Sequence, residues 1–363
     1  MKPQAAVTNM SAVGMSQASH VRRPFTTPLG RALSFSVLGF GTAPLGNMGR
    51  VLTEADADAV LSAAWSSGAR YIDTAPLYGH GLSEARVGRL LQGKPRDEVI
   101  VSTKVGRLLE PCAPGEERSG AFLATPPFRV RFDYARDGVL RSLEASLGRL
   151  GLDRVDILLV HDCEPKTHGS AAAYEARWSE LTTGGGWRAL DELRAAGVVS
   201  AIGMGVNEVA PCERMLADLD PDLFLLAGRY TLLEQAPLHG LMASCTRRGV
   251  GVVIGGPYNS GVLAHPTGSF DYAKPPPEVL ARVERLRAAC DRFGASLKAA
   301  ALQFAGAHPA VVSVIPGGQT PEEVSDNAAS LDEVVPDALW TTLKAEGLLD
   351  PAAPTPRAEA LAC

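Results

Sequence analysis

The sequence predicts a single-domain (β/α)8 barrel, and three observations support this fold. Short runs of β-branched and apolar residues alternate with longer amphipathic runs along most of the chain. The short runs are continuously apolar, which is typical of parallel strands buried on both faces. Eight such runs occur. Eight β units in strict alternation with helices favour a closed barrel over an open doubly wound sheet.

The expected strands and helices follow from these runs. Residues 53–67 begin with a threonine cap and an acidic first turn, as helices often do. Residues 133–150 place apolar side chains at helical spacing, and the helix at 187–196 ends before a glycine. The expected strands are residues 34–40, 70–73, 99–103, 155–160, 198–203, 223–226, 250–254 and 311–315. The other expected helices are residues 208–219, 238–248, 277–293, 296–308 and 321–330.

We expect one barrel domain over residues 31–349, between a loose extension at 1–30 and a mobile tail at 350–363. Two segments interrupt the alternation. Residues 107–131 follow the third expected strand and residues 164–186 follow the fourth, and both are predicted to be long loops. Loops after strands lie on the C-terminal face of a barrel, where the sites of such proteins are built.

The bulk composition excludes several classes of protein. The net charge is −5 and no dense basic run occurs, which argues against a nucleic-acid partner. Six cysteines without a CxxC pair indicate neither a metal site nor a redox motif, and scattered thiols predict a cytoplasmic location. No apolar run is long enough for a membrane span, so no membrane partner is expected. No heptad pattern indicates an oligomer, and the oligomeric state stays open.

Three polar side chains end consecutive strands of the predicted barrel. Asp73 ends the second strand, Lys104 the third and His161 the fourth, while Tyr78 lies five residues beyond Asp73. Because the carboxyl ends of parallel strands meet at one rim, we expect these four residues to form one catalytic site.

The chemistry of these four residues suits hydride transfer at a carbon that bears oxygen. A tyrosine has an ordinary pKa near 10, and a neighbouring ammonium such as that of Lys104 lowers it. Asp73 would hold Lys104, Tyr78 would exchange a proton with the substrate, and His161 would orient the substrate oxygen. Each residue alone also has an ordinary interpretation as a surface ion pair, a structural histidine or packing. Four of them at one rim favour the catalytic interpretation.

Several motifs resemble the aldo-keto reductase superfamily. The motifs GFGTAPLGN, DTAPLYGHGLSE, VSTKVGR, DILLVHD and VVSVIPGG occur in a consistent order within residues 33–348. The segments RFDYARDGVLRSLEASLGRLGLDRVDILLVHD, LLAGRYTLLEQ and VGVVIGGPYNSGVLA resemble its branch of L-fucose (D-threo-aldose) 1-dehydrogenases, L-galactose dehydrogenases and pyridoxal 4-dehydrogenases. The resemblance implies the same barrel, the four residues above as the catalytic tetrad, and a nicotinamide dinucleotide bound without a Rossmann domain. The absence of GxGxxG after an early strand agrees with this.

The resemblance also implies where the cofactor lies, with its phosphates near the seventh and eighth strands. Glycines there would let the backbone approach a pyrophosphate, and a helix led by Pro321 would direct its N-terminus inward. In isolation, the same segments are equally typical of ordinary Gly/Pro turns. Asn207 would hold the nicotinamide amide. The predicted cofactor-binding residues are Gly41, Thr42, Asp73, Asn207, Gly255, Gly256, Pro257, Asn259, Ser260, Gly261, Ile315, Gly317, Gly318, Glu323 and Asn327.

Departures from the family pattern predict cofactor choice. Gly317 and Glu323 stand where NADP-preferring relatives place a lysine and an arginine. A carboxylate repels the 2′-phosphate and accepts hydrogen bonds from ribose hydroxyls, so we predict NAD, with NADP as the alternative. The aromatic residue that often stacks on the nicotinamide is replaced by Gly255, and a common glutamine by Ala227. Tyr258 and Arg229 are candidates to compensate.

The predicted function is NAD(P)-dependent oxidation of an aldose such as L-fucose or D-arabinose at C1 to a lactone. The expected partner is therefore a small-molecule sugar or aldehyde substrate. Two alternatives stay open. One is a pyridoxal 4-dehydrogenase or a general aldehyde or alcohol oxidoreductase, and the other is a cofactor-binding regulatory subunit with little turnover. His168 and Tyr258 are candidate substrate contacts, and Trp178 is a third for which packing is as good an explanation.

Overall fold

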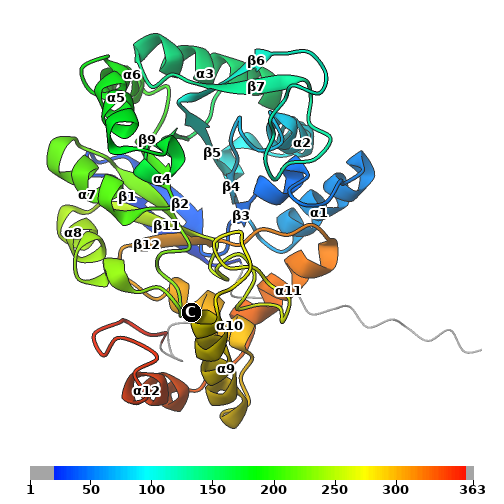
Figure 1. The fold of residues 1–363 in the computed structure, drawn as a ribbon, viewed down its shortest axis with the longest axis vertical. Coiled ribbons are helices and arrows are strands. Elements are labelled where there is room, and N and C mark those ends of the chain that lie inside the picture. The colour runs from blue at the N-terminus through cyan, green and yellow to red at the C-terminus, as the bar shows by residue number, and fades with distance from the viewer. Residues whose placement is uncertain (1–19, 357–363) are drawn as a thin grey trace, which may run out of the picture.

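Eight parallel strands form the centre of the molecule in the computed structural model, which describes residues 20–356 (Figure 1). They pair in the order β3-β4-β5-β8-β9-β10-β11-β12. The ring is closed by a parallel bridge between Leu38 and Val314, where Gly39 N donates to Val314 O at 2.9 Å. The predicted (β/α)8 barrel is therefore confirmed. The strands are β3 (Phe40–Gly41), β4 (Tyr71–Asp73), β5 (Ile100–Val105), β8 (Ile157–His161), β9 (Ala201–Val206), β10 (Leu223–Ala227), β11 (Gly251–Gly255) and β12 (Val311–Ile315).

Helices surround the barrel because alternate strand residues face opposite sides (Figure 1). In β8, Leu158 and Val160 join the apolar layer under the helices, while Ile157 and Leu159 fill the barrel interior. The helix α1 begins as predicted, at a capping box between Thr53 and Asp56. The main helices are α1 (Glu54–Ser66), α2 (Leu82–Leu91), α3 (Arg136–Leu150), α6 (Gly186–Ala195), α7 (Val209–Asp218), α8 (Leu241–Arg248), α9 (Pro277–Arg292), α10 (Leu297–Ala305), α11 (Pro321–Asp332) and α12 (Asp337–Ala345).

A hairpin closes the N-terminal end of the barrel. The strands β1 (Arg22–Thr26) and β2 (Ala32–Ser36) pair antiparallel, and Phe25, Leu33 and Phe35 pack against the first residues of the barrel strands. The structure thus differs from the expected strand at 34–40, which divides into β2 and β3, and from a loose extension reaching residue 30. The reason is that Leu33 and Phe35 alternate along β2 and Phe25 lies opposite Leu33 in β1, so three apolar side chains face the barrel. Residues 1–19 lie outside the described part of the chain.

The two segments predicted as long loops contain regular structure. Residues 107–131 include β6 (Arg107–Pro111), which pairs antiparallel with β7 (Phe128–Phe132). Residues 164–186 include α4 (Pro165–His168) and α5 (Ala171–Leu181). The Ser170 side chain caps α5 by accepting from Ala173 N, and Trp178 is among the residues the helix buries. Both segments follow barrel strands and extend the C-terminal rim.

The end of the described chain packs against the barrel instead of forming the expected mobile tail. Ala353 is fully buried, and Asp350 accepts a hydrogen bond from His239 at 2.8 Å. Asp350 N also donates to Gln235 Oε1 at 2.8 Å. These contacts join Asp350 and Ala353 to the rest of the protein, and residues 357–363 of the predicted tail lie outside the described residues.

Two features are absent from residues 20–356. None of their helices combines the length and the apolar character that a membrane crossing requires. Within the same residues, no three His, Cys, Asp or Glu side chains are grouped so that they could hold a metal ion.

Candidate active site

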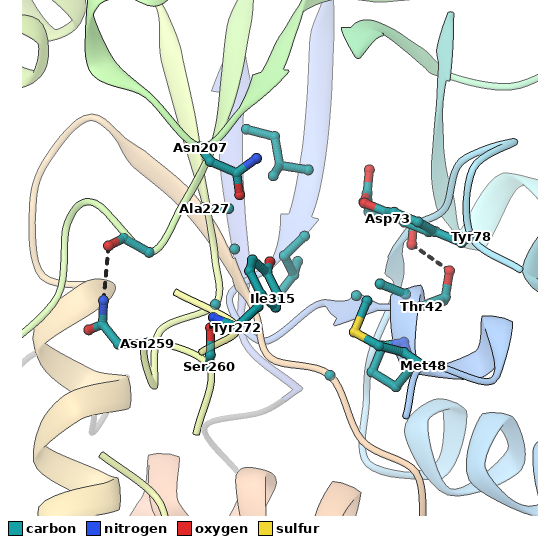
Figure 2. Close-up of a pocket in the computed structure, with 18 of the residues that line it drawn as sticks. Thr42, Met48, Asp73, Tyr78, Asn207, Ala227, Asn259, Ser260, Tyr272 and Ile315 are labelled. Carbon is teal, nitrogen blue, oxygen red and sulfur yellow. Dashed lines mark hydrogen bonds between the residues drawn. The ribbon is translucent and has the colours of Figure 1, made fainter. Parts of the chain in front are cut away.

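The structure brings the four predicted residues together at the C-terminal rim. Asp73 is the last residue of β4, Lys104 lies near the end of β5, and His161 is the last residue of β8. Tyr78 lies in the turn between β4 and α2. Its ring lies edge-on to the His161 ring, with 5.8 Å between the ring centroids. Asp73 and Tyr78 occupy the same side of the cavity in Figure 2.

The Lys104 ammonium is fully engaged and points at Tyr78. Its Nζ donates to Asp73 Oδ2 at 2.6 Å, to Thr74 O at 3.0 Å and to Tyr78 Oη at 3.1 Å. The other Asp73 oxygen accepts from Ser102 Oγ at 2.6 Å. Lys104 has only three donors, so these partners fix its position. Only 1% of the Lys104 surface is exposed, which shields the ion pair from water.

Burial dominates the electrostatics of Tyr78. Loss of water raises the pKa of its phenol well above the ordinary value, and the Asp73 and Asp162 carboxylates add to the rise. The Arg107 guanidinium lowers this pKa, but by less. Burial thus outweighs the expected lowering of the Tyr78 pKa by the Lys104 ammonium. Near neutral pH, the Tyr78 hydroxyl therefore carries its proton.

His161 is held as a neutral imidazole. Burial lowers the pKa of His161 well below its ordinary value, and the charges of Arg107 and Lys104 lower it further. Its backbone oxygen accepts from Tyr134 Oη at 2.7 Å, which anchors the end of β8. A neutral imidazole keeps one N–H, so it can donate a hydrogen bond to a substrate oxygen without adding a positive charge.

A hydrogen-bond network orients Asn207 at the edge of the cavity. Its Nδ2 donates to Asp162 Oδ1 at 3.2 Å and to Glu164 Oε1 at 3.1 Å, and its backbone N donates to Glu164 Oε2 at 2.7 Å. Arg107 Nη2 donates to Asp162 Oδ2 at 2.5 Å. Since two carboxylates take the amide hydrogens, the carbonyl oxygen of Asn207 is the atom available to a ligand.

The cavity beside Tyr78 continues into a second groove along the rim. The cavity is lined by Asp73, Tyr78 and Asn207, and Figure 2 shows these side chains around its centre. The groove runs past residues 256–261 to Glu323. The two share the lining residues Pro44, Met48, Gly256, Ser260, Tyr272 and Gly317, which makes them one elongated depression. Its shape suits an extended dinucleotide with one end beside Tyr78.

Most of the predicted cofactor residues line this depression. Those in the cavity are Gly41, Thr42, Asp73, Asn207, Gly255, Gly256, Asn259, Ser260, Ile315 and Gly317. Those in the groove include Pro257, Gly261, Gly318 and Glu323. Asn327 lines neither part. It is buried and braces the groove, accepting from Tyr258 Oη at 3.0 Å and donating to Gly317 O at 3.3 Å.

Asn259 lines the cavity, but its side chain is used within the protein. Its Nδ2 donates to Gly228 O at 3.0 Å and its Oδ1 accepts from Thr231 Oγ1 at 2.5 Å. Ser260 Oγ accepts from Tyr272 N at 3.1 Å. Both side chains therefore hold the loop after β11. The groups of this loop that can still bind a phosphate are its backbone N–H groups and the Ser260 hydroxyl proton.

Glycine is required where the walls of the depression approach each other. A Cβ on Gly317 would lie 2.7 Å from Pro44 Cγ, and one on Gly41 would lie 3.0 Å from Ile315 O. At the far end, Thr320 caps α11, and Glu323 Oε2 accepts from Gln319 N at 2.7 Å. A narrow glycine-lined passage that ends at a helix N-terminus fits a dinucleotide, with the Glu323 carboxylate at the groove's far end.

The candidate substrate residues lie outside the cavity. The His168 ring packs 4.7 Å from the Phe132 ring, and burial with two arginines lowers the pKa of His168 to about 4. The hydroxyl of Tyr258 is used by Asn327, and its ring lines only the groove. Trp178 is buried in the core, which agrees with the alternative interpretation that it serves packing.

The sequence did not point to several residues of the site. Tyr272 lines both parts of the depression with 66% of its surface exposed and a φ of +64°. Its neighbour Asp271 accepts two hydrogen bonds of 2.9 Å from Arg229, so the Arg229 side chain is used within the protein. Tyr272 is the aromatic residue that lines the same cavity as Gly255 together with Tyr78. No periodic pattern marks this segment. Asp162 and Glu164 could have been found from the sequence, because both carboxylates lie within three residues of the end of a buried strand.

Comparisons with known proteins agree on one family. The family model described as "Aldo/keto reductase family" matches residues 37–346. The chain is 43% identical over 348 residues to pyridoxal 4-dehydrogenase of Microbacterium luteolum, covering 91% of this chain and 99% of that protein. It is 39% identical over 332 residues to D-threo-aldose 1-dehydrogenase of a Pseudomonas species, covering 89% and 96%. The holo form of aldo-keto reductase AKR11C1 from Bacillus halodurans has the same fold, with a TM-score of 0.69 at 23% identity over 92% of this chain and 98% of that one.

Proposed function

The chain belongs to the aldo/keto reductase family and is an NAD(P)-dependent oxidoreductase, and on that premise we propose that it oxidises a cyclic hemiacetal to a lactone with NAD. The observation that carries the proposal is the contact of Tyr78 Oη with the buried Lys104–Asp73 pair, beside a neutral His161. The leading substrate is an aldose such as L-fucose or D-arabinose, oxidised at C1.

In this proposal, Tyr78 and His161 bind the substrate hydroxyl from two sides. His161 donates its N–H to the oxygen and fixes its direction. Tyr78 accepts the hydroxyl proton as the C–H bond breaks, and Lys104 stabilises the phenolate that performs this step. Asp73 keeps Lys104 in place. The nicotinamide ring, when bound, supplies the hydride acceptor, and Asn207 with the residues lining the depression would hold the cofactor.

Pyridoxal is the second candidate substrate, because one of the similar proteins is a pyridoxal 4-dehydrogenase at 43% identity. Aldoses and pyridoxal share a chemical feature. Each closes on itself through an internal hydroxyl to give a ring hemiacetal, whose carbon carries a hydroxyl, which loses its proton, and a hydrogen, which leaves as hydride. The same arrangement of Tyr78 and His161 would serve either ring.

The test is steady-state turnover, followed by the absorbance of the reduced cofactor, with L-fucose, D-arabinose, pyridoxal, and open-chain alcohols and aldehydes. We expect kcat/KM for at least one ring hemiacetal to exceed that for every open-chain compound by about tenfold or more. The methyl glycoside of the same sugar is the matched control, because it lacks the anomeric hydroxyl and should be inert. Cofactor binding without turnover on the whole panel would overturn the proposal and favour a regulatory subunit.

The NAD preference is the second part of the proposal. Its support is Glu323, whose carboxylate lines the far end of the groove, with Gly317 also lining it. We expect NAD to give the higher kcat/KM, and Glu323→Gln to raise relative use of NADP by about tenfold, because a repelling charge is removed. Glu322→Gln, which removes an exposed neighbouring charge, is the matched control. An NADP advantage in the unmodified protein would contradict this part. The cytoplasmic location also belongs to the proposal, supported by five free cysteines among the described residues.

A further inference from the structure

Glu164 is a deeply buried carboxylate beside the cavity that lacks a cationic partner. Only 1% of its surface is exposed. Its oxygens accept from Asn207 N at 2.7 Å, from Asn207 Nδ2 at 3.1 Å and from Thr167 Oγ1 at 3.1 Å. Within residues 20–356, no lysine or arginine nitrogen lies within ion-pairing distance of it. A buried charge without a counter-charge costs free energy, so its presence calls for an explanation.

The neighbouring carboxylates are each balanced. Asp73 pairs with Lys104 at 2.6 Å, Asp162 with Arg107 at 2.5 Å, and Asp271 with Arg229 at 2.9 Å. These pairs leave no nearby arginine or lysine unused for Glu164. Lys166, two residues from Glu164 in the chain, also pairs with Asp271 at 3.7 Å, so every cation of this group is directed at a carboxylate other than Glu164.

The contacts of Glu164 are all hydrogen bonds that its carboxyl oxygens accept. All three groups that bind it are donors, which suits the acceptor-only ionised form. Burial and the Asp162 charge raise the pKa of Glu164, while the hydrogen bonds from Asn207 and Thr167 lower it. A neutral acceptor would satisfy the same donors without a buried charge, so orienting Asn207 does not by itself explain a carboxylate.

We propose that Glu164 makes the site selective for the oxidised form of the cofactor. The inference rests on the proposed function, in which Asn207 holds the nicotinamide amide. The oxidised nicotinamide ring carries a positive charge and the reduced ring does not, while the amide is the same in both. A fixed negative charge behind Asn207 therefore distinguishes the two forms by charge. It favours retention of the oxidised form and release of the reduced form, as a dehydrogenase requires.

Coulomb's law gives the size of the effect. Two unit charges within about 10 Å, at an effective dielectric constant of about 20, change a binding equilibrium by about tenfold. Glu164→Gln should therefore raise the Kd for NAD⁺ about tenfold more than the Kd for NADH. The variant also disturbs the hydrogen bonds to Asn207, but that loss applies equally to both forms because they share the amide. The ratio of the two dissociation constants isolates the charge.

The experiment measures both dissociation constants on the full chain, by calorimetry for NAD⁺ and by cofactor fluorescence for NADH. Asn207→Ala should weaken both forms and leave their ratio unchanged. Glu213→Gln, which removes an exposed carboxylate from α7, is the matched control for net charge and should leave both constants unchanged. Arg107→Met leaves Asp162 without its cation and should shift the ratio toward NAD⁺, which tests the inference even if Glu164→Gln does not fold.

Different outcomes would contradict the role of Glu164 and the proposed dehydrogenase function. An unchanged ratio in Glu164→Gln, or no shift toward NAD⁺ in Arg107→Met, overturns the role of Glu164 while leaving the proposed function intact. An unmodified protein that binds neither cofactor form overturns the proposed function, and this inference with it. Binding of both forms, with a ratio that moves in opposite directions in the two variants, supports the inference.

Discussion

Replacing Tyr78 with phenylalanine removes one oxygen atom from the centre of the site and leaves the ring in place. The ring contacts His161 edge-on at 5.8 Å and lies 4.7 Å from Lys104 Nζ, and both contacts survive the change. The change removes the hydroxyl oxygen that would accept the substrate proton. If Tyr78 moves the substrate proton, Tyr78→Phe should lower kcat by about 100-fold or more, which is the ordinary size of an acid–base contribution.

The structure predicts that stability changes little in the same variant. Lys104 loses its contact with Tyr78 Oη at 3.1 Å but keeps Asp73 at 2.6 Å and Thr74 O at 3.0 Å. One hydrogen bond to a charged group contributes about 1.5–3 kcal/mol, and removing an otherwise buried hydroxyl offsets part of this. We expect the free energy of unfolding to fall by about 1 kcal/mol, a shift of a few degrees in Tm.

The assay combines turnover, binding and unfolding on the same protein preparations. A structural role would lower activity, cofactor affinity and Tm together, whereas a proton-transfer role lowers kcat alone. Tyr174→Phe is the matched control, because Tyr174 is a buried tyrosine of α5 that does not line the cavity, so the same atom is removed away from the site. A Tyr78→Phe variant that keeps more than about a tenth of the wild-type kcat would refute the assignment.

Three further predictions concern Lys104, the pH dependence of oxidation, and Arg86. Lys104→Met should destabilise the fold by about 3–5 kcal/mol, because it leaves Asp73 buried without its cation, and Asp73→Asn in the same chain should restore part of the loss; urea unfolding measures both. Because the pKa of Tyr78 is raised, the phenolate is scarce near neutrality, so kcat/KM for oxidation should rise up to about tenfold per pH unit, whereas reduction should not; a fall in the oxidation rate with rising pH would contradict this. Arg86→Met should cost about 3 kcal/mol and raise the KM for the cofactor, because Arg86 Nη1 donates to Leu45 O at 2.6 Å and Nη2 to Leu52 O at 2.9 Å, holding the segment that lines the groove; an unchanged KM in a folded variant would argue against that role.

The sequence predicted the barrel and most of the rim because both depend on short-range patterns. Apolar runs locate strands, and polar residues at their carboxyl ends, such as Asp73 and Lys104, meet at one edge whatever the loop geometry. The apolar residues Phe25, Leu33 and Phe35 also indicate strands, but no local pattern shows that these strands pair as a hairpin. The segment at 128–132 has the alternation of a strand as well, and it lay inside an expected loop.

Other parts of the site depend on contacts that no local pattern records. Asn207 meets Asp162 and Glu164, which are 45 and 43 positions away, only because β8 and β9 are adjacent in the barrel. The raised pKa of Tyr78 follows from burial and from two carboxylates, and side-chain burial depends on the complete fold. Tyr272 reaches the cavity through a left-handed backbone conformation that a non-glycine residue rarely adopts.

The closure of the barrel also governs when the chain can complete its fold during synthesis. The hairpin of β1 and β2 and the first strand, β3, all contact β12. The bridge from Leu38 to Val314 joins residues made at opposite ends of translation. At about 5–20 residues per second, the first strands leave the ribosome roughly 15–60 s before the strand that completes their sheet. During this interval the contacts of β1, β2 and β3 with β12 cannot form, so the barrel closes only after nearly all of its strands have been made.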